Sequence, residues 1–285
     1  MTTANQVTEV CTAHGEGPFW DSARDRLLVV DMLRGAVVAV GASGATERYE
    51  LGGVAAAVRA RRAGGYVLAT ERGFRLYTPD FVPDGAEVPA FTDARIRMND
   101  GGCDPQGRFY CGTMAYAATP GAGTLYRLDP DLSVHPVLTG VTISNGLQWA
   151  ADQRHAYYND TPTGRVDRYD FDAVSGSFGD RRTFATIEPD HGKPDGMAID
   201  DEGGVWVALW GGGAVHRYDD TGTLSDRIEL PVRQVTACAF GGTDGTTLYI
   251  TTSRDGLGDA AEAEAGAVFA AETGVRGATQ HTFAA

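Results

Sequence analysis

The stretch NDGGCDPQGRFYCGTM, residues 99–114, holds the pattern that decides the fold. It divides into a short strand, a turn of Asp, Pro and Gly residues, and a second strand that is largely apolar. A third strand ending in Tyr and Asp follows most segments of this kind, as GTLYRLDPD and GRVDRYDFD do. Five further segments share the pattern: EGPFWDSARDRLLVVD (16–31), VAAAVRARRAGGYVLAT (54–70), NGLQWAADQRHAYYND (145–160), DGMAIDDEGGVWVAL (195–209) and TACAFGGTDGTTLYITT (236–252).

The first residues of successive segments lie 38 to 50 residues apart. A period of this length with several short strands in each repeat is typical of a propeller blade. Helical repeats share the period, but they need long amphipathic runs, and turn residues interrupt this chain too often for those. We therefore predict an all-β fold, a single six-bladed β-propeller domain over residues 1–285. Each blade should have about four antiparallel strands, and helix should make up less than about 10% of the chain.

A circular array has to be closed, because an open edge strand invites aggregation. The N-terminal stretch QVTEVCTA (6–13) has no other partner in the repeat pattern. We expect it to complete the last blade beside the C-terminal strands. The alternative is that residues 1–12 form a loose tail.

Charge and composition exclude several classes of function. Asp and Glu number 38 against 24 Lys and Arg, a formal charge of −14, which argues against nucleic-acid binding. No apolar run approaches the ~20 residues of a membrane span. The first ten residues lack the basic and apolar parts of a secretory signal, and four Cys make no disulfide framework. We expect a cytoplasmic protein that acts on a small molecule, as a monomer or a weak homo-oligomer.

Residues at one repeat position of a propeller form a ring around its central channel. In this chain the ring would contain two carboxylates, Glu16 and Asp195, and two amides, Asn99 and Asn145, all facing one channel mouth. Like charges held close need something positive between them. Their oxygens suit Ca²⁺, Mg²⁺ or Mn²⁺, with Zn²⁺ or Fe²⁺ as alternatives. The competing interpretation is that Asn-Gly and Asp-Gly are ordinary turn pairs. The first positions of the six segments are Glu16, Val54, Asn99, Asn145, Asp195 and Thr236.

The segments EGPFW, RMNDGGCDPQGRFYCGTM, ISNGLQW, PDGMAID and SRDG, in this order, resemble the gluconolactonase/regucalcin (senescence marker protein) family from about residue 14 to 270. The resemblance implies a six-bladed propeller that hydrolyses sugar lactones with one divalent metal at the channel mouth. It implies that Glu16, Asn145 and Asp195 are the metal ligands. It makes Arg97 and Asn99 substrate contacts.

One departure from the family concerns the wall of the pocket. After the motif GTM, animal members carry an acidic pair whose second Glu contacts sugar hydroxyls. This chain has Ala115-Tyr116-Ala117 there. We expect the wall to lack that carboxylate and the sugar preference to differ from that of the animal enzymes.

The sequence thus predicts a metal-dependent hydrolase that opens sugar lactones to aldonic acids, with Ca²⁺ as the first expectation for the metal. Asp195 is the candidate catalytic base that takes a proton from the attacking water; the alternative is that it is a ligand only. Motifs of other hydrolases and of nucleotide-binding proteins, HExxH, GxSxG and the P-loop, do not occur. Two other functions stay open: an organophosphate or aryl-ester hydrolase on the same metal site, and a non-enzymatic metal-binding propeller.

Overall fold

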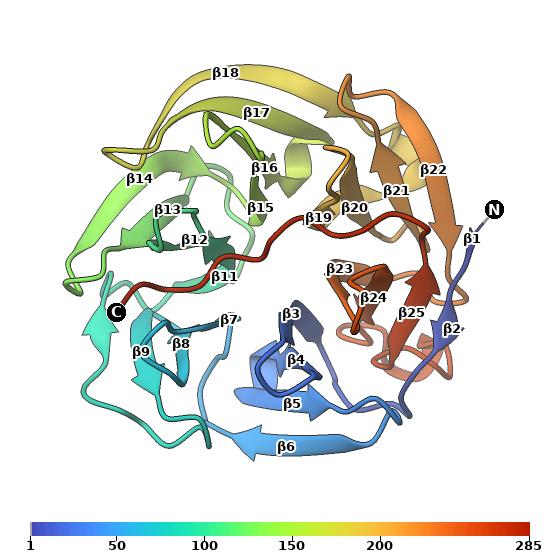
Figure 1. Ribbon diagram of the computed structural model, residues 1–285, viewed down its shortest axis with the longest axis horizontal. Coiled ribbons are helices and arrows are strands. Elements are labelled where there is room, and N and C mark those ends of the chain that lie inside the picture. The colour runs from blue at the N-terminus through green and yellow to red at the C-terminus, as the bar shows by residue number, and fades with distance from the viewer. Residues whose placement is uncertain (1) are drawn as a thin grey trace.

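The computed structural model describes residues 2–285, and six sheets stand around a central channel in it (Figure 1). Each sheet is a meander in which strands that follow one another in sequence pair with one another. The innermost strand of each blade lines the channel, and the outermost lies on the rim. The prediction of a six-bladed propeller with about four strands in each blade is confirmed.

The first three blades each contain four strands in sequence order. Blade one contains β3 (Gly15–Asp21), β4 (Arg26–Asp31), β5 (Ala36–Val40) and β6 (Thr46–Glu50). Blade two contains β7 (Ala57–Ala60), β8 (Tyr66–Ala69), β9 (Gly73–Tyr77) and β10 (Val88–Pro89). Blade three contains β11 (Ile96–Cys103), β12 (Phe109–Ala115), β13 (Gly123–Leu128) and β14 (Val134–Val141).

The remaining blades follow the same order, and two of them add a strand from the N-terminal segment. Blade four contains β15 (Ser144–Trp149), β16 (His155–Asp160), β17 (Arg165–Asp172) and β18 (Ser177–Thr186). Blade five contains β19 (Lys193–Ile199), β20 (Val205–Trp210), β21 (Ala214–Tyr218), β22 (Leu224–Glu229) and β1 (Thr2–Thr3). Blade six contains β23 (Val235–Gly241), β24 (Thr247–Thr252), β25 (Val268–Glu272) and β2 (Asn5–Gln6).

Burial explains why a strand in the middle of a blade, such as β5, is apolar on both faces. All five residues of β5 are buried, because blades cover both sides of it, whereas β6 on the rim exposes all but one of its residues. The part of the chain that the structure describes has no α-helix. Its helical residues lie in four short 3-10 helices: η1 (Met32–Arg34), η2 (Thr161–Thr163), η3 (Pro189–His191) and η4 (Gly258–Ala260).

The N-terminal segment lies against the last two blades. β2 pairs antiparallel with β25, and the Val7 backbone N–H continues this edge by donating to the Val268 carbonyl at 2.8 Å. β1, which the sequence pattern did not indicate, pairs parallel with β22 of blade five. The segment therefore crosses from one blade to the next and covers two rim edges rather than one.

The C-terminal segment 273–285 has no place in the repeat, and it crosses one mouth of the channel (Figure 1). The Ala278 N–H donates to the Ile199 carbonyl of blade five at 2.9 Å, and the Phe283 N–H donates to the Ala60 carbonyl of blade two at 2.9 Å. Between them, Gln280 bonds to the Phe240 carbonyl and the Trp20 N–H, which belong to blades six and one. The tail thus ties four blades together at the ends of their inner strands.

Two of the exclusions drawn from composition can be compared with the structure. Cys11, Cys103, Cys111 and Cys238 are all free thiols, so Cys103 and Cys111 do not bridge their hairpin. Within residues 2–285, no helix has the length and apolar character needed to span a membrane.

Candidate active site

A β-bulge marks the ring position in five of the six blades. The register between the inner strand and its neighbour shifts between Glu16 and Phe19 in β3, and between Asn145 and Leu147 in β15. The inner strands of blades three, five and six have the same shift, whereas β7 of blade two has none. A bulge turns a side chain away from the pleat, so the strands aim their ring residues into the channel.

Two glycines make the bulges sterically feasible. Gly17 and Gly146, directly after Glu16 and Asn145, have φ values of 51° and 33°. A Cβ atom on Gly146 would lie 2.6 Å from Asn159 Nδ2 and 2.7 Å from the Asp195 carbonyl oxygen. Any larger residue there would push neighbouring blades apart at the ring.

Side-chain amides connect three of the expected site residues. Arg97 Nη1 donates to Asn99 Oδ1 at 2.6 Å, and Asn99 Nδ2 donates to Asn145 Oδ1 at 3.1 Å and to the Ser144 carbonyl at 2.8 Å. Both donors of the Asn99 amide are therefore used inside the protein, which leaves it one free lone pair on Oδ1. Asn99 holds Asn145 in place as well as facing the channel.

Two residues of blade four fix the strand that carries Asp195. Thr161 Oγ1 accepts from Asn145 Nδ2 at 2.8 Å and donates to the Pro194 carbonyl at 2.9 Å. Asn159 Nδ2 donates to the Asp195 carbonyl at 2.7 Å. Neither residue has the ring phase of the repeat, so the sequence analysis did not select them.

The ring holds more negative charge than the one arginine beside it, Arg97, offsets. Glu16 and Asp195 are both buried, and burial together with Asp100 raises the pKa of Glu16 to about 8. Burial and then the Glu16 charge raise the pKa of Asp195 well above its usual range. Oxygen Oδ1 of Asp195 is buried and has no hydrogen-bond partner among residues 2–285.

These observations fit a divalent cation held by oxygen ligands. A buried carboxylate oxygen without a partner is costly, and a cation between Glu16 and Asp195 would remove both that cost and their repulsion. No group of three or more His, Cys, Asp or Glu side chains that could hold a metal occurs in residues 2–285. The ring offers two carboxylates and takes its third oxygen from the amide of Asn145, a donor type suited to hard cations.

The other two ring positions do not offer a ligand. Val54 lies before the start of β7 and is apolar. The Thr236 hydroxyl is within hydrogen-bonding distance of the Gly15 carbonyl at 2.6 Å and of Thr251 Oγ1 at 2.8 Å. Thr236 therefore steadies the strand that carries Glu16.

The pocket wall around Tyr116, which was expected to lack a carboxylate, contains that of Glu71. The Tyr116 hydroxyl donates to Glu71 Oε1 at 2.9 Å, and the Arg97 guanidinium lies 5.9 Å from the centre of the Tyr116 ring. Glu71 follows β8 of blade two, so the charge comes from a neighbouring blade. The GTM motif itself carries no acid, as expected, but the wall is not purely apolar.

His14 also lies at this mouth, two residues before Glu16. Burial, and then the Arg97 charge, lower the pKa of His14 to about 4. Its Nδ1 lies 2.7 Å from Ser253 Oγ, and its ring packs edge-on against Trp210 at 5.9 Å between centroids. His14 precedes the ring residue Glu16 by two positions, as Arg97 precedes Asn99.

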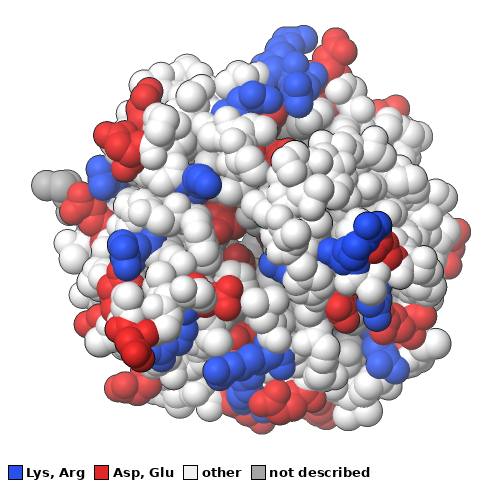
Figure 2. Space-filling model, turned by 180° about the vertical axis from the view of Figure 1, so that it is seen from behind, with Lys and Arg blue, Asp and Glu red and all other residues white. Residues whose placement is uncertain are grey.

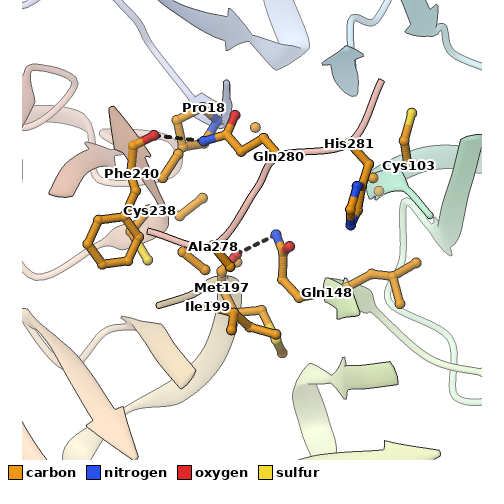
Figure 3. A pocket seen from close by; sticks show the side chains of 18 of the residues that line it. Pro18, Cys103, Gln148, Met197, Ile199, Cys238, Phe240, Ala278, Gln280 and His281 are labelled. Carbon is orange, nitrogen blue, oxygen red and sulfur yellow. Dashed lines mark hydrogen bonds between the residues drawn. The ribbon is translucent and has the colours of Figure 1, made fainter. Parts of the chain in front are cut away.

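The channel opens on the face away from the tail. Figure 2 shows this face, with a hollow at its centre and acidic atoms on the wall of the hollow. Below the ring, a small cavity of about 50 Å³ extends from Gly17, Asp100 and Gly196 down to the tail. Ala278, Gln280 and His281 cross its far end (Figure 3). The tail closes that end, so a substrate reaches the ring from the open mouth.

Comparison with known proteins places this chain in a family. The family model described as the SMP-30/gluconolactonase/LRE-like region matches residues 14–254. Regucalcin of Sus scrofa is 37% identical over 284 residues, which cover 95% of this chain and 94% of the relative.

Two solved structures share the fold at 28% identity. A luciferin-regenerating enzyme superposes with a TM-score of 0.92 over 100% of both chains. A calcium-binding protein, regucalcin, from Agrobacterium tumefaciens superposes with a TM-score of 0.90 over 99% of both chains. Together with the matched family model, these likenesses show that this chain belongs to the SMP-30/gluconolactonase/LRE-like family.

Proposed function

We propose that this protein is a divalent-metal-dependent lactonase that hydrolyses sugar lactones to aldonic acids. The buried and unpartnered Oδ1 of Asp195, beside Glu16 and Asn145, is the observation that carries the proposal. The family name includes gluconolactonase, and one similar structure is described as calcium-binding. Glu16, Asn145 and Asp195 would hold the cation, with Ca²⁺ as the first candidate. Four free thiols agree with a cytoplasmic location.

Arg97 binds the lactone in this proposal. Its Nη1 is committed to Asn99, the Met98 carbonyl and Met32 Sδ. The remaining guanidinium donors have no partner in the described chain and are not shut off from solvent. They can donate to the ring oxygen or the hydroxyls of a lactone.

Asp195 moves the proton. The ionised Asp195 carboxylate can accept a proton from water, and the nearby Glu16 charge favours that transfer. Asp195 takes one proton as the water oxygen bonds to the carbonyl carbon. It returns a proton to the ring oxygen as the ester C–O bond breaks, which gives a hydroxy acid. A bound divalent cation would supply Lewis-acid polarisation of the lactone carbonyl.

The polar wall favours a sugar over an aryl ester. Arg97, Glu71 and the Tyr116 hydroxyl offer both donors and acceptors around the mouth. A pH-drop assay over five- and six-carbon aldonolactones, with an aryl ester and an organophosphate alongside, tests the choice. The protein is treated with chelator and then receives Ca²⁺, Mn²⁺, Zn²⁺ or Fe²⁺ separately. We expect lactone opening that chelation abolishes and one cation restores; activity on the aryl ester or organophosphate alone, or on none of the compounds, overturns the proposal.

Replacing Arg97 with Ala is expected to lower kcat/KM for an aldonolactone by a factor on the order of 10–100, the range expected for a lost charged hydrogen bond. Metal content, measured by atomic emission, should not change. Arg95→Ala is the matched control, because the Arg95 side chain is 87% exposed two residues away. Normal kinetics in Arg97→Ala, or loss of its metal, would make Arg97 a structural residue.

Cation binding is expected to release protons. The pKa of Glu16 is about 8 and that of Asp195 is raised, so the site carries protons at neutral pH that the cation must displace. The affinity for Ca²⁺ should fall as the pH drops from 8 to 6, by up to about tenfold per pH unit for each proton displaced. Calorimetry in two buffers of different ionisation enthalpy counts these protons. Glu16→Gln should bind more weakly and with a flatter pH profile, whereas a pH-independent affinity in the wild type would contradict the assignment.

A further inference from the structure

His14 has a fixed backbone at the open mouth. The Ala13 and His14 N–H groups donate to Asp31 Oδ1 at 3.0 and 3.1 Å, and Arg48 holds the other oxygen of that carboxylate at 2.9 Å. His14 is 8% exposed. Since it precedes Glu16 by two residues, its side chain shares the face that Glu16 turns to the channel.

The imidazole ring is fixed as well. Trp210 packs against it edge to face at an interplanar angle of 78°, and Ser253 Oγ lies 2.7 Å from Nδ1. An aromatic contact and a short hydrogen bond from two other blades leave the ring one orientation.

Ser253 determines which ring nitrogen carries the hydrogen. Ser253 Oγ accepts a hydrogen bond from the Asp255 N–H at 3.0 Å. The hydrogen of its own hydroxyl group then needs an acceptor. The acceptors in reach are His14 Nδ1 at 2.7 Å and the Ala13 carbonyl at 3.5 Å, and the shorter contact is the stronger one. Donation from the hydroxyl to Nδ1 uses the shorter of these two contacts, and in a neutral imidazole it places the hydrogen on Nε2.

Nε2 is free to meet a ligand. It has no hydrogen-bond partner among residues 2–285, and it is in contact with solvent. The groups that influence His14 electrostatically are Arg97, Asp255 and Asp31, so it lies on the same mouth as the substrate arginine.

We propose that the Nε2–H of His14 is a substrate-binding donor that contacts an oxygen of the lactone, with Ser253 setting its tautomer. This inference rests on the proposed lactonase function and deepens it. A neutral imidazole with hydrogen on Nε2 can donate there and cannot accept, so it selects carbonyl, ring or hydroxyl oxygens that present a lone pair.

The tautomer can be tested without any turnover. Long-range ¹H–¹⁵N correlation spectra of histidine-labelled protein separate the two neutral tautomers, and His14→Phe assigns the signal. We expect Nε2–H for His14 in the wild type, and a loss of this single tautomer in Ser253→Ala. A hydrogen on Nδ1, or a protonated ring, overturns the proposal.

Kinetics test the contact itself. His14→Phe keeps a ring against Trp210 and removes the donor, so KM for the best aldonolactone should rise by about 3–10-fold, as for a neutral hydrogen bond, while kcat stays within about twofold. His14→Gln, whose amide can donate from the Nε2 position, should show a smaller rise of KM than His14→Phe. His135→Gln, at an exposed position on the rim strand β14, is the control, and metal content should be the same in all variants.

The outcomes separate this proposal from the one on which it rests. An unchanged KM in His14→Phe, with full lactonase activity in the wild type, overturns only the role of His14. A wild type that opens no lactone overturns the proposed function and this contact together. Loss of bound metal in His14→Phe would make His14 part of the support for the ring and would also overturn the contact.

Discussion

Replacing Asp195 with Ala is expected to abolish turnover, with kcat falling by at least about 10³-fold, because one change removes a cation ligand and the proposed base. Asp201→Ala is the matched control, since Asp201 is exposed in the turn directly after the same strand. The assay is the pH-drop measurement with the best aldonolactone and the best cation. Activity above about a tenth of the wild type would exclude Asp195 from both roles.

The substitution Asp195→Asn separates the effect on activity from the effect on stability. In metal-free protein, Asp195 and Glu16 have raised pKa values, so folding is most favourable while they are protonated. For Glu16 this stability is lost as the pH rises from about 4.5, the ordinary pKa of the group, to about 8. Asp195→Asn should therefore be inactive, yet in chelator it should lose less Tm than the wild type between pH 6 and 9. Melting curves of both proteins over that range decide this. A parallel loss in the two proteins would show that Asp195 is not held against another negative charge.

The ring of polar residues could be predicted from the sequence, because residues at the same position of successive repeats come together around the axis of a propeller. Glu16, Asn99, Asn145 and Asp195 share one phase, and the structure places a bulge at that phase in each of their strands. Glycine follows three of these residues, and two of the three, Gly17 and Gly146, occupy the left-handed region.

The support around the ring could not be predicted in the same way. Thr161, Asn159 and Ser253 act through contacts between neighbouring blades, and which residues meet there depends on the packing angle of two sheets. Glu71 reaches the wall of blade three from blade two, so a motif search along blade three finds Tyr116 and misses the carboxylate. His14 was not selected either, although it precedes Glu16 by two residues as Arg97 precedes Asn99.

The tail was missed because it has no repeat to reveal it. Residues 273–285 follow the last blade and contain no alternating strand pattern, yet they bond to blades one, two, five and six. Gln280 and Ala278 close the channel at the mouth opposite the ring (Figure 3). The proposed substrate-binding groups accordingly all belong to the other mouth.

Phe283 fastens that tail, and Phe283→Ala is expected to lower the free energy of unfolding by about 3–5 kcal/mol, the usual loss for a fully buried phenylalanine. Its side chain is 0% exposed within the core of blades two and three, and its carbonyl accepts from the Arg62 N–H at 2.8 Å. Urea unfolding of both proteins measures the difference. Val174→Ala, at a side chain 93% exposed, is the control and should stay within about 0.5 kcal/mol of the wild type.

Because Phe283 and the ring lie at opposite mouths, kcat/KM of the folded Phe283→Ala variant should be unchanged. A loss below about 1 kcal/mol would mean that the tail does not contribute to holding the blades together.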